Sequence, residues 1–588
     1  MRLHKKAAKT NRGYEAPRVI RSVKLALQGV RPPARKQAAQ HRTVPDLPQP
    51  LSRRERLQIV DQGLRILRDT YAHLRMKQAM HAIDPIGRLE LLRRAVPKSE
   101  ESRFDDEQFH REMLDIFFSL RDRHTVYTLP DYWGGRIAFL PFMVEEITER
   151  SARKYIVSKI LNHARSSSFA EGVEIVSWNG VPIEQAVWSY AQRHAGSNLD
   201  ARRAMGLLNL TLRALQFDPP PDERWVVVEY RLGGRRGKLQ SRKFDWKIGD
   251  DPWPSARRPR AHDGALANDA KLATVQNARL AMYGGKPKAR RAGRPVTRSV
   301  RGVSFTEMKT TSWRIFRART YRTPDGTFGY IRIWKFNDLG EKQFLQEFID
   351  LLKRMPGEGL IIDIRGNPGG KINLAEVILQ TLTPARIYPE TFQFRNTPLT
   401  LDICVKAPES EGLAPWKESI EEGLATGAIY SAAFPKSNEK RCNSIPQQYF
   451  GPAVLITDAL TYSAGDIFAA GFQDHKIGPV LGTHDTTGAG GANRWNYDKL
   501  LSLNLRGEPF RLLPGGAGFH VAVRRSLRVL GKNGAILEDF GVKADRRHYM
   551  TRDDVLNDNV DLIRKAGELL RKRRAPFDLE IRRMQQAP

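Results

Sequence analysis

The chain has 588 residues and a formal net charge of +32, because 97 Lys and Arg face 65 Asp and Glu. Hydrophobic residues make up 40% and charged residues 28%, values of globular proteins that argue against wholesale disorder or a fibrous repeat. No apolar run reaches the roughly 18 residues of a membrane-spanning helix. Cys404 and Cys442 form no disulfide framework, zinc spacing or redox pair.

Most of the excess charge lies in two segments. Residues 1–50 and residues 257–301 each carry a net charge of about +10, and both contain prolines and few periodic apolar residues. Such stretches cannot bury enough apolar surface to order themselves. The sequence predicts a basic disordered tail over 1–50 and a basic linker over 253–320. Their charge is either ordinary solvated charge or a salt-sensitive contact for an anionic partner, made through 1–50 and 257–301.

An N-terminal helical domain is predicted over 51–130. Apolar residues after Ser52 recur at three- and four-residue spacing, which builds one apolar stripe on a helix. Ser52 and Glu55 have the spacing of a capping box at its start. A second helix is predicted around residues 105–120.

A small β-rich module is predicted over 131–252. Asn179-Gly180 favours a tight reversal directly after a predicted strand. A helix is predicted from about 183 to 192. The predicted strands cover 136–140, 173–178 and 225–230.

Strands and helices alternate over 321–570, which predicts an α/β core with a parallel sheet and helical crossovers. Residues 571–588 are interpreted as a C-terminal tail. The predicted strands cover 328–333, 359–364 and 454–457, and the predicted helices cover 341–354, 374–382 and 463–473.

A glycine-rich loop at 363–370, Asp-Ile-Arg-Gly-Asn-Pro-Gly-Gly, directly follows a predicted buried strand. Glycines let backbone N–H groups approach a ligand closely, so the loop can stabilise a phosphate or the oxyanion of a tetrahedral intermediate. It lacks the Lys-Ser/Thr ending of a nucleotide-binding P-loop. A purely structural turn is the alternative interpretation.

A second candidate motif places Ser463 at the start of a predicted helix. Exposed N–H groups and the positive end of the helix suit a nucleophile whose intermediate carries a negative oxygen. The alternative is structural, because Ser463 and Asp466 also have the spacing of a capping box.

These two segments, 363–370 and 461–470, resemble in this order the tail-specific, or C-terminal-processing, serine peptidases. The resemblance is clearest over 325–490 and implies a crotonase/ClpP-like parallel-sheet peptidase core. It implies that Ser463 is the nucleophile and that no metal or other cofactor is needed. It also implies an oxyanion hole, formed by the N–H groups of Ala464 and of Gly369 or Gly370.

The general base departs from the commonest members of that family, which use a lysine in a loop after the serine. The matching residues 486–490 have Ala489 at that position, and alanine cannot accept a proton. Either catalysis is lost or the base lies elsewhere, because a serine needs its base within hydrogen-bond reach but not within sequence reach.

The tricorn-core branch of the family uses an upstream histidine and a downstream glutamate. Residues 120–125 resemble its histidine motif, and residues 534–542 resemble its glutamate motif. The resemblance therefore implies a triad of Ser463, His124 and Glu538, in which the carboxylate orients and stabilises the imidazolium.

Rival residues remain open for two of the three positions. His484 and His475 are alternative bases, and Asp539 is an alternative carboxylate beside Glu538.

Residues 172–183 resemble the strand and Asn-Gly turn of a PDZ domain, a module that captures extended peptides by strand addition. An ordinary β-hairpin explains the same residues.

The sequence thus predicts a serine-type endopeptidase that acts on protein or peptide substrates through an acyl-enzyme. The alternative, motivated by Ala489, is an inactive peptidase-fold binding or scaffolding protein. Binding of an anionic partner is compatible with both. No signal peptide follows Met1, so a cytoplasmic location is expected by default, with a non-Sec route out of the cytoplasm left open.

Overall fold

The computed structural model describes residues 50–96, 106–193, 196–232, 237–250, 270–283, 297–336 and 340–586. Nearly all of the predicted basic tail, and residues 257–269 and 284–296 of the second basic segment, lie outside these ranges. Within them, no helix is long and apolar enough to cross a membrane. Cys404 and Cys442 are both buried, free thiols.

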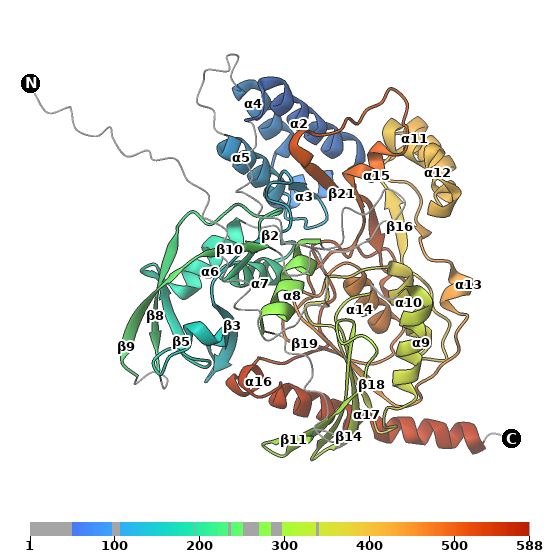
Figure 1. The fold of residues 1–588 in the computed structure, drawn as a ribbon. Coiled ribbons are helices and arrows are strands. Elements are labelled where there is room, and N and C mark those ends of the chain that lie inside the picture. The colour runs from blue at the N-terminus through green and yellow to red at the C-terminus, as the bar shows by residue number, and fades with distance from the viewer. Residues whose placement is uncertain are drawn as a thin grey trace, which may run out of the picture.

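Helices form the N-terminal part of the chain, at the top of Figure 1. The predicted capping box is confirmed: Ser52 Oγ accepts the Glu55 N–H at 3.3 Å, and the Glu55 carboxylate accepts the Ser52 N–H at 2.8 Å. The apolar face of the last helix packs Phe117 against Phe519, with ring centroids 5.2 Å apart. The elements are α2 (Arg53–Arg65), the π-helix η1 (Ile66–Thr70), α3 (Leu74–His81), α4 (Pro85–Ala95) and α5 (Asp106–Ser119).

The predicted β-rich module is confirmed as a six-stranded sheet in the order β3-β4-β5-β8-β9, with β6 on β5, at the left of Figure 1. Asn179 and Gly180 have φ angles of 50° and 77° and close the predicted tight turn between β5 and β6. The elements are β3 (Phe142–Glu149), β4 (Ala152–Ile160), η2 (Asn162–Ala164), β5 (Glu174–Trp178), β6 (Val181–Pro182), α6 (Ile183–Gln192), α7 (Leu199–Asn209), β8 (Trp225–Arg231) and β9 (Leu239–Asp245). A separate three-stranded sheet joins β2 (Arg136–Phe139), β7 (Leu212–Ala214) and β10 (Lys247–Asp250).

The main sheet has eight strands in the order β11-β12-β13-β14-β15-β18-β19-β22. The predicted parallel core is confirmed from β14 to β22, and β11 to β14 pair antiparallel, so the sheet is mixed. The strands are β11 (Thr297–Val300), β12 (Val303–Met308), β13 (Phe316–Thr323), β14 (Gly326–Ile333), β15 (Leu360–Asp363), β18 (Ala453–Thr457), β19 (Val480–Gly482) and β22 (Arg546–Arg547).

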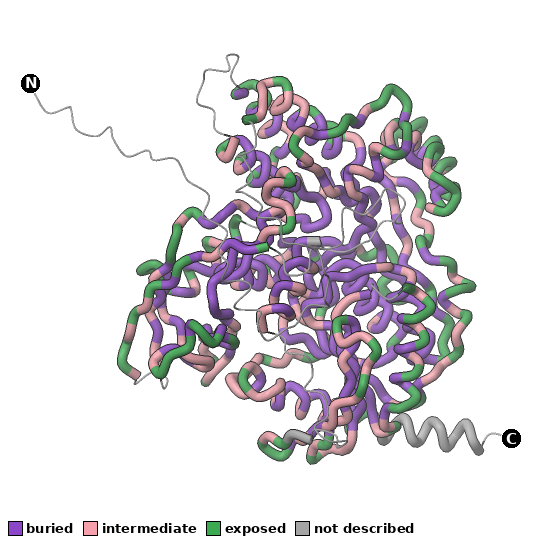
Figure 2. Tube along the Cα trace, in the orientation of Figure 1, coloured by how far each residue is buried: buried purple, intermediate pink, exposed green. Residues whose placement is uncertain are grey.

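Helices cover both faces of this sheet, which makes its central strands fully buried. Leu360 and Ile362 of β15 pack with the helices α9, α10 and α14, whereas Ile361 packs with α17 on the opposite face. Figure 2 shows the resulting buried interior, with exposed residues gathered on the outer helices and loops. The four helices are α9 (Glu341–Leu352), α10 (Ile372–Gln380), α14 (Ala464–Asp474) and α17 (Val560–Gln586).

A second sheet packs beside the first, in the order β1-β21-β16-β17, with β20 paired to β21. Its strands are β1 (Val126–Thr128), β16 (Thr391–Phe394), β17 (Phe434–Pro435), β20 (Ala492–Asn496) and β21 (Gly518–Leu527). The remaining helices are α8 (Ala270–Tyr283), α11 (Pro398–Lys406), η4 (Glu409–Glu411), α12 (Ala414–Thr426), α13 (Glu439–Cys442), α15 (Tyr497–Leu501), η5 (Pro514–Gly516), η6 (Leu530–Lys532) and α16 (Arg552–Leu556).

Two predicted segments differ from the structure. The predicted linker 253–320 contains α8 and the strands β11 and β12, and α8 buries Leu272, Val275 and Ala278 in an apolar cluster. The predicted C-terminal tail from 571 onward is helical, because α17 extends to Gln586. The flanking residues 257–269 and 284–301 are rich in Arg and Lys, and residues 571–583 are rich in charge, so both segments were predicted to lack order.

Two buried glutamates meet where α10 faces the start of β16. The Glu390 N–H donates to Glu376 Oε1 at 2.8 Å, and each residue is only 2% exposed. Burial raises the pKa of Glu376 to about 7 and raises the pKa of Glu390 well above its usual range. The pair therefore stays partly protonated near neutral pH.

Glu376 should contribute a loss of stability as pH rises from about 4.5 to about 7, because folded Glu376 binds a proton in this range that the unfolded chain has released. Each tenfold change in proton affinity is worth about 1.4 kcal/mol. The variant Glu376→Gln should flatten this slope and be more stable than wild type above pH 7, measured by urea unfolding across the range. The exposed control Glu421→Gln should retain the wild-type slope; an unchanged slope in Glu376→Gln would contradict the assignment.

Candidate active site

Two loops meet at the edge where the parallel strands β15 and β18 end. The Gly366 N–H donates to Asp458 Oδ1 at 2.6 Å, and the Tyr462 N–H donates to the Asn367 carbonyl at 2.9 Å. Parallel neighbouring strands bring the loops after their carboxyl ends together, and these hydrogen bonds fix the two loops to each other. The two sequence motifs are therefore parts of one site.

Asp363, the last residue of β15, holds the glycine-rich loop in place. Its fully buried carboxylate pairs with the guanidinium groups of Arg332 and Arg365. Burial acts to raise the pKa of Asp363, but the two arginines outweigh it and hold that pKa well below its usual range. The Asp-x-Arg part of the motif is thus a structural ion pair that holds the loop in place.

Ser463 has an uncommon backbone conformation at the first turn of α14. Its φ of 58° and ψ of −125° place a non-glycine residue at positive φ, a strained conformation that is concentrated at functional sites. The alternative capping box with Asp466 is wrong, because the Ser463 side chain makes no capping bond. Asp466 instead accepts the N–H groups of Ala489 and Gly490, at 3.2 and 2.9 Å.

The loop where related peptidases place their lysine is held by Asp466. Burial raises the pKa of this carboxyl to about 6. Ala489 is fully buried and has a φ of 62°. Its methyl group is enclosed by neighbouring residues and supplies no basic group. A lysine from this loop plays no part in the site.

Gly369 lies directly against Ser463. A Cβ on Gly369 would lie 2.5 Å from Ser463 Cβ and 2.8 Å from the Ala464 nitrogen. Of the two glycines predicted as oxyanion donors, Gly369 already donates its N–H to Asn367 Oδ1 at 2.7 Å. Gly370 bridges to Phe336 in parallel register, so its own N–H points away from Phe336.

His124 lies in the turn between α5 and β1. Its ring centroid is 4.7 Å from that of Tyr462, the residue before Ser463, and the His124 side chain is fully buried. The His124 N–H donates to Asp122 Oδ1 at 2.7 Å, which fixes the turn. Residues more than 300 positions apart in the sequence are thus brought next to each other.

The two rival histidines lie in different surroundings. His475 has both ring nitrogens engaged, with Nδ1 2.8 Å from the Gly471 carbonyl and Nε2 accepting the Tyr388 N–H at 2.9 Å. Burial lowers the pKa of His484, whose ring faces the charges of Asp458 and Arg547. His475 therefore caps α14 and has no ring nitrogen left for catalysis.

Glu538 is fully buried and receives two donors on one oxygen. Its Oε1 accepts from Lys77 Nζ at 2.7 Å and from Ser197 Oγ at 3.2 Å. Burial and the charge of Asp122 raise the pKa of Glu538 well above its usual range, and Lys77 opposes this shift. The rival carboxylate Asp539 also pairs with Lys77, at 2.8 Å.

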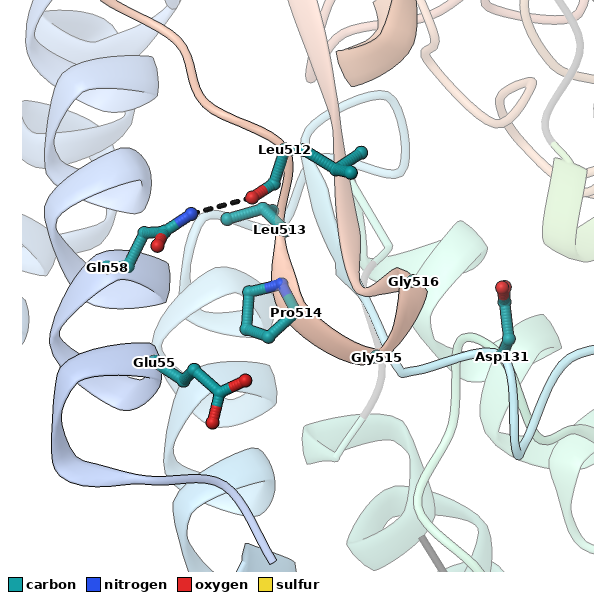
Figure 3. A pocket seen from close by; sticks show the side chains of 8 residues that line it. All are labelled: Glu55, Gln58, Asp131, Leu512, Leu513, Pro514, Gly515 and Gly516. Atoms are coloured by element: carbon teal, nitrogen blue, oxygen red, sulfur yellow. Dashed lines mark hydrogen bonds between the residues drawn. The ribbon is translucent and has the colours of Figure 1, made fainter. Parts of the chain in front are cut away.

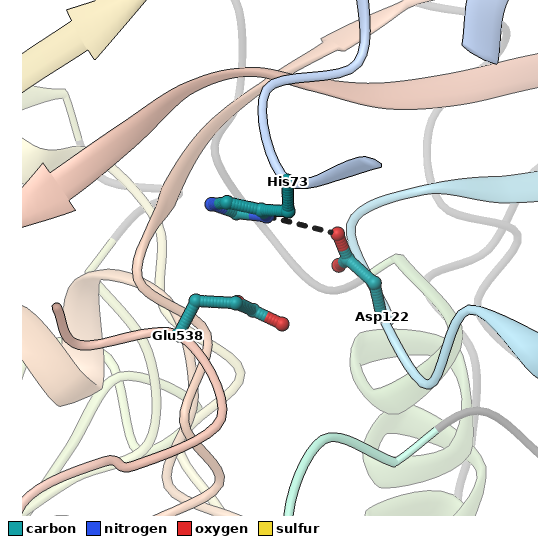
Figure 4. Close-up of side chains that lie close together, drawn as sticks. All are labelled: His73, Asp122 and Glu538. Atoms are coloured by element: carbon teal, nitrogen blue, oxygen red, sulfur yellow. Dashed lines mark hydrogen bonds and ion pairs between the residues drawn. The ribbon is translucent and has the colours of Figure 1, made fainter. Parts of the chain in front are cut away.

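His73, Asp122 and Glu538 converge from three parts of the chain, as Figure 4 shows. His73 Nδ1 lies 3.3 Å from Asp122 Oδ2, and ligand-type atoms of all three residues lie within 4.8 Å of one another. Metal ions bind in such clusters, but here Lys77 supplies a positive charge against Glu538. We assign the cluster no metal, and the absence of a cofactor stays a prediction.

Sequence analysis missed Lys77, Asp122 and Ser197. Two of them come from segments with no recognised motif, and Asp122 lies unremarked inside the histidine motif. One signal was present: His73, Lys77 and His81 are spaced four residues apart and so share one face of a helix.

The β-rich module touches the site through the residues that precede and begin α7. Besides the bond from Ser197 to Glu538, Asn198 Nδ2 donates to the Thr487 carbonyl at 2.8 Å. Asp200 Oδ2 accepts the Asp485 N–H at 3.0 Å. The module therefore holds both the glutamate and the loop that contains Ala489.

A separate open pocket of about 440 Å³ lies between α2 and the segment that precedes β21 (Figure 3). Gln58 Nε2 donates across it to the Leu512 carbonyl at 2.6 Å. It shares no residue with the site around Ser463. Its lining residues are Glu55, Gln58, Asp131, Leu512, Leu513, Pro514, Gly515 and Gly516.

Comparisons with known families match residues 327–504 to peptidase family S41 and residues 136–253 to the PDZ domain. The chain thus contains an S41 peptidase domain and a PDZ domain. It is a serine-type peptidase, and the predicted PDZ-like module is confirmed as a PDZ domain. A search of curated protein sequences found no match.

Solved structures with the same fold include mature CPAF, with a TM-score of 0.61 and 16% identity, covering 89% of this chain and 98% of that chain. Mature CPAF complexed with lactacystin matches with a TM-score of 0.59 and 16% identity, and the match covers 89% of this chain and 99% of that chain. The photosystem II D1 C-terminal processing protease has a TM-score of only 0.35 at 14% identity, covering 84% and 92%. At 16% identity, the likeness to CPAF shows that the two proteins share a fold. The TM-score of 0.35 is too low to support any conclusion.

The variant Gly369→Ala should lower kcat by about 100-fold or more, because the new methyl group would displace Ser463. The control Gly427→Ala also places alanine at positive φ, 78°, but in open space. It should cost about 1–2 kcal/mol of stability and leave kcat unchanged. Wild-type kcat in Gly369→Ala, measured on a fluorogenic peptide, would contradict the packing described.

Proposed function

We propose that Ser463, His124 and Glu538 form the catalytic triad of this serine peptidase. The observation that carries the proposal is the strained Ser463, which sits at the positive end of α14 with Gly369 against its side chain and His124 packed on the preceding residue. This is the environment that a nucleophile with an anionic intermediate requires.

In the proposed reaction, Ser463 Oγ attacks the carbonyl carbon of a peptide bond, and His124 takes the hydroxyl proton. The N–H groups of Ala464 and Gly370 donate to the oxyanion of the tetrahedral intermediate. His124 then gives its proton to the leaving amine as the C–N bond breaks, which leaves an acyl-enzyme. Water attacks the ester, passes a proton through His124 to Ser463, and releases the new carboxylic acid.

Glu538 is proposed to stabilise the imidazolium form of His124 from the buried cluster that Asp122 also joins. Asp122 fixes the backbone of His124, and its carboxylate lies close to that of Glu538. A carboxylate charge in this cluster favours the protonated ring during proton transfer, and the charges of Asp122 and a protonated His124 attract each other.

The alternative is a binding or scaffolding protein on the same fold. Ala489 at the family lysine position favours it, because a Ser–Lys dyad is absent from this loop. The two functions differ in one property: only the peptidase turns over substrate through Ser463.

The variants Ser463→Ala and His124→Ala should each lower kcat/KM on an unfolded protein substrate by about 10⁴-fold or more, because each removes a group that acts in every step. The exposed control Ser444→Ala should retain wild-type activity. Cleavage by Ser463→Ala at the wild-type rate would refute the triad. A folded wild type that binds peptides without cleaving them would favour the scaffolding alternative.

We further propose that residues 1–50 and 257–301 bind an anionic partner independently of catalysis. Their net charge of about +20 out of +32 lies outside every motif of the peptidase site.

Deleting residues 1–49 and replacing the Lys and Arg residues of 286–294 with Gln should lower the salt concentration that elutes the protein from heparin. The logarithm of the affinity should fall linearly with the logarithm of the salt concentration, as expected for phosphate-like contacts. Peptide cleavage should stay at the wild-type rate. Unchanged elution of the double variant would exclude these segments as the binding site.

A further inference from the structure

One face of α3 presents three basic groups to three buried acids. His73, which precedes the helix, contacts Asp122, and His81 Nε2 lies 3.3 Å from Asp539 Oδ1. Lys77, midway between them, is fully buried. Burying an ammonium group costs several kcal/mol unless its charge and all its N–H groups are satisfied, so its partners are informative.

The Lys77 ammonium group has three oxygen partners, two of them hydrogen-bond acceptors and the third an ion-pair partner. Nζ donates to Glu538 Oε1 at 2.7 Å and to the Arg121 carbonyl at 3.2 Å, and it lies 2.8 Å from Asp539 Oδ2. Arg121 stands three residues before His124 and has a positive φ of 52°. One ammonium group thus joins the turn that carries His124 to the loop that carries Glu538.

The charge of Lys77 also decides how easily Glu538 ionises. Burial and Asp122 both raise the pKa of Glu538, and Lys77 is the largest opposing influence. Burial acts to lower the pKa of Lys77 itself, but the two carboxylates outweigh it and raise that pKa, so Lys77 stays charged. The titratable or charged groups that face Glu538 are Lys77, His73, Asp122, Asp539 and Tyr71, and His81 and Arg121 lie behind them.

We propose that Lys77 is a positioning residue of the catalytic site, whose ammonium group favours the ionised form of Glu538 and fixes the His124 turn against it. The proposal rests on the triad proposed above. Lys77 touches neither substrate nor Ser463 and acts through Glu538. It differs from a Ser–Lys base, because its proton stays on the lysine.

The test is the pH profile of kcat/KM in the full chain. In Lys77→Met, Glu538 should need a higher pH to ionise, so the acid limb should move up by about one pH unit or more. Activity should fall at least about tenfold near neutral pH and recover partly at higher pH. Lys77→Arg, which keeps the charge, should retain the wild-type acid limb.

The matched control is His81→Gln, which removes a basic contact to Asp539 and none to Glu538. Its acid limb should stay at the wild-type pH. A Lys77→Met profile that is parallel to wild type, or a shift as large in His81→Gln, would overturn the proposal. Activity of Ser463→Ala would instead overturn the triad, so the two failures are distinguishable.

If Lys77→Met does not fold, the folded fraction of the double variant Lys77→Met with Glu538→Gln is measured by circular dichroism. Removing one partner of a buried ion pair is strongly destabilising, whereas replacing both is tolerated far better. Recovery of the fold in the double variant would support the electrostatic coupling of Lys77 to Glu538. If adding Asp539→Asn, so that neither carboxylate is left without its partner, still leaves the protein as unfolded as the single variant, Lys77 acts by packing and the proposal is overturned.

Discussion

The site depends on the hydrogen bonds that join the loops after β15 and β18. The Tyr462 N–H donates to Asn367, and the Gly366 N–H donates to Asp458, so neither loop can move without the other. This coupling holds Ser463 against Gly369. The buried ion pairs of Asp363 beneath the loop resist displacement, because separating a buried charge from its partner is costly. Every other part of the site is arranged around this fixed pair of loops.

Around that pair, three distant parts of the chain contribute one group each. The turn after α5 contributes His124, the loop after β21 contributes Glu538, and the PDZ domain contributes Ser197. Lys77 and Asp122 link the first two through buried and part-buried contacts. Ser463 and His124 are also fully buried, so the arrangement described is that of a closed site.

Much of the fold could be predicted from the sequence, because its patterns are local. The run 359–364 and the Asn179-Gly180 turn each specify their structure within a few residues, and both predictions are confirmed. The order of the glycine-rich loop and the serine helix also indicated the family. The capping box at Ser463 was a wrong interpretation, because the spacing of Ser463 and Asp466 does not reveal that the loop of Asn367 and Gly369, far away in the sequence, packs against this turn.

The buried cluster could not be predicted, for a physical reason. Lys77 and Glu538 are 461 positions apart, and the spacing of His73, Lys77 and His81 indicates a shared helix face without distinguishing a buried ion pair from a solvated surface charge. Most of the formal charge of +32 lies instead in the two basic segments, 1–50 and 257–301. The charges closest to the proposed chemistry are the few that the fold buries and balances: Lys77, Asp122, Glu538 and Asp539.

The central claim is that Ser463 is a nucleophile activated without a lysine. Its most direct test is reaction of the folded protein with a serine-directed fluorophosphonate, followed by peptide mapping by mass spectrometry. The account predicts that the label is on the peptide containing Ser463 and that His124→Ala slows labelling strongly. A protein that cleaves peptides while Ser463 stays unlabelled, or that labels Ser463 equally fast without His124, would contradict it.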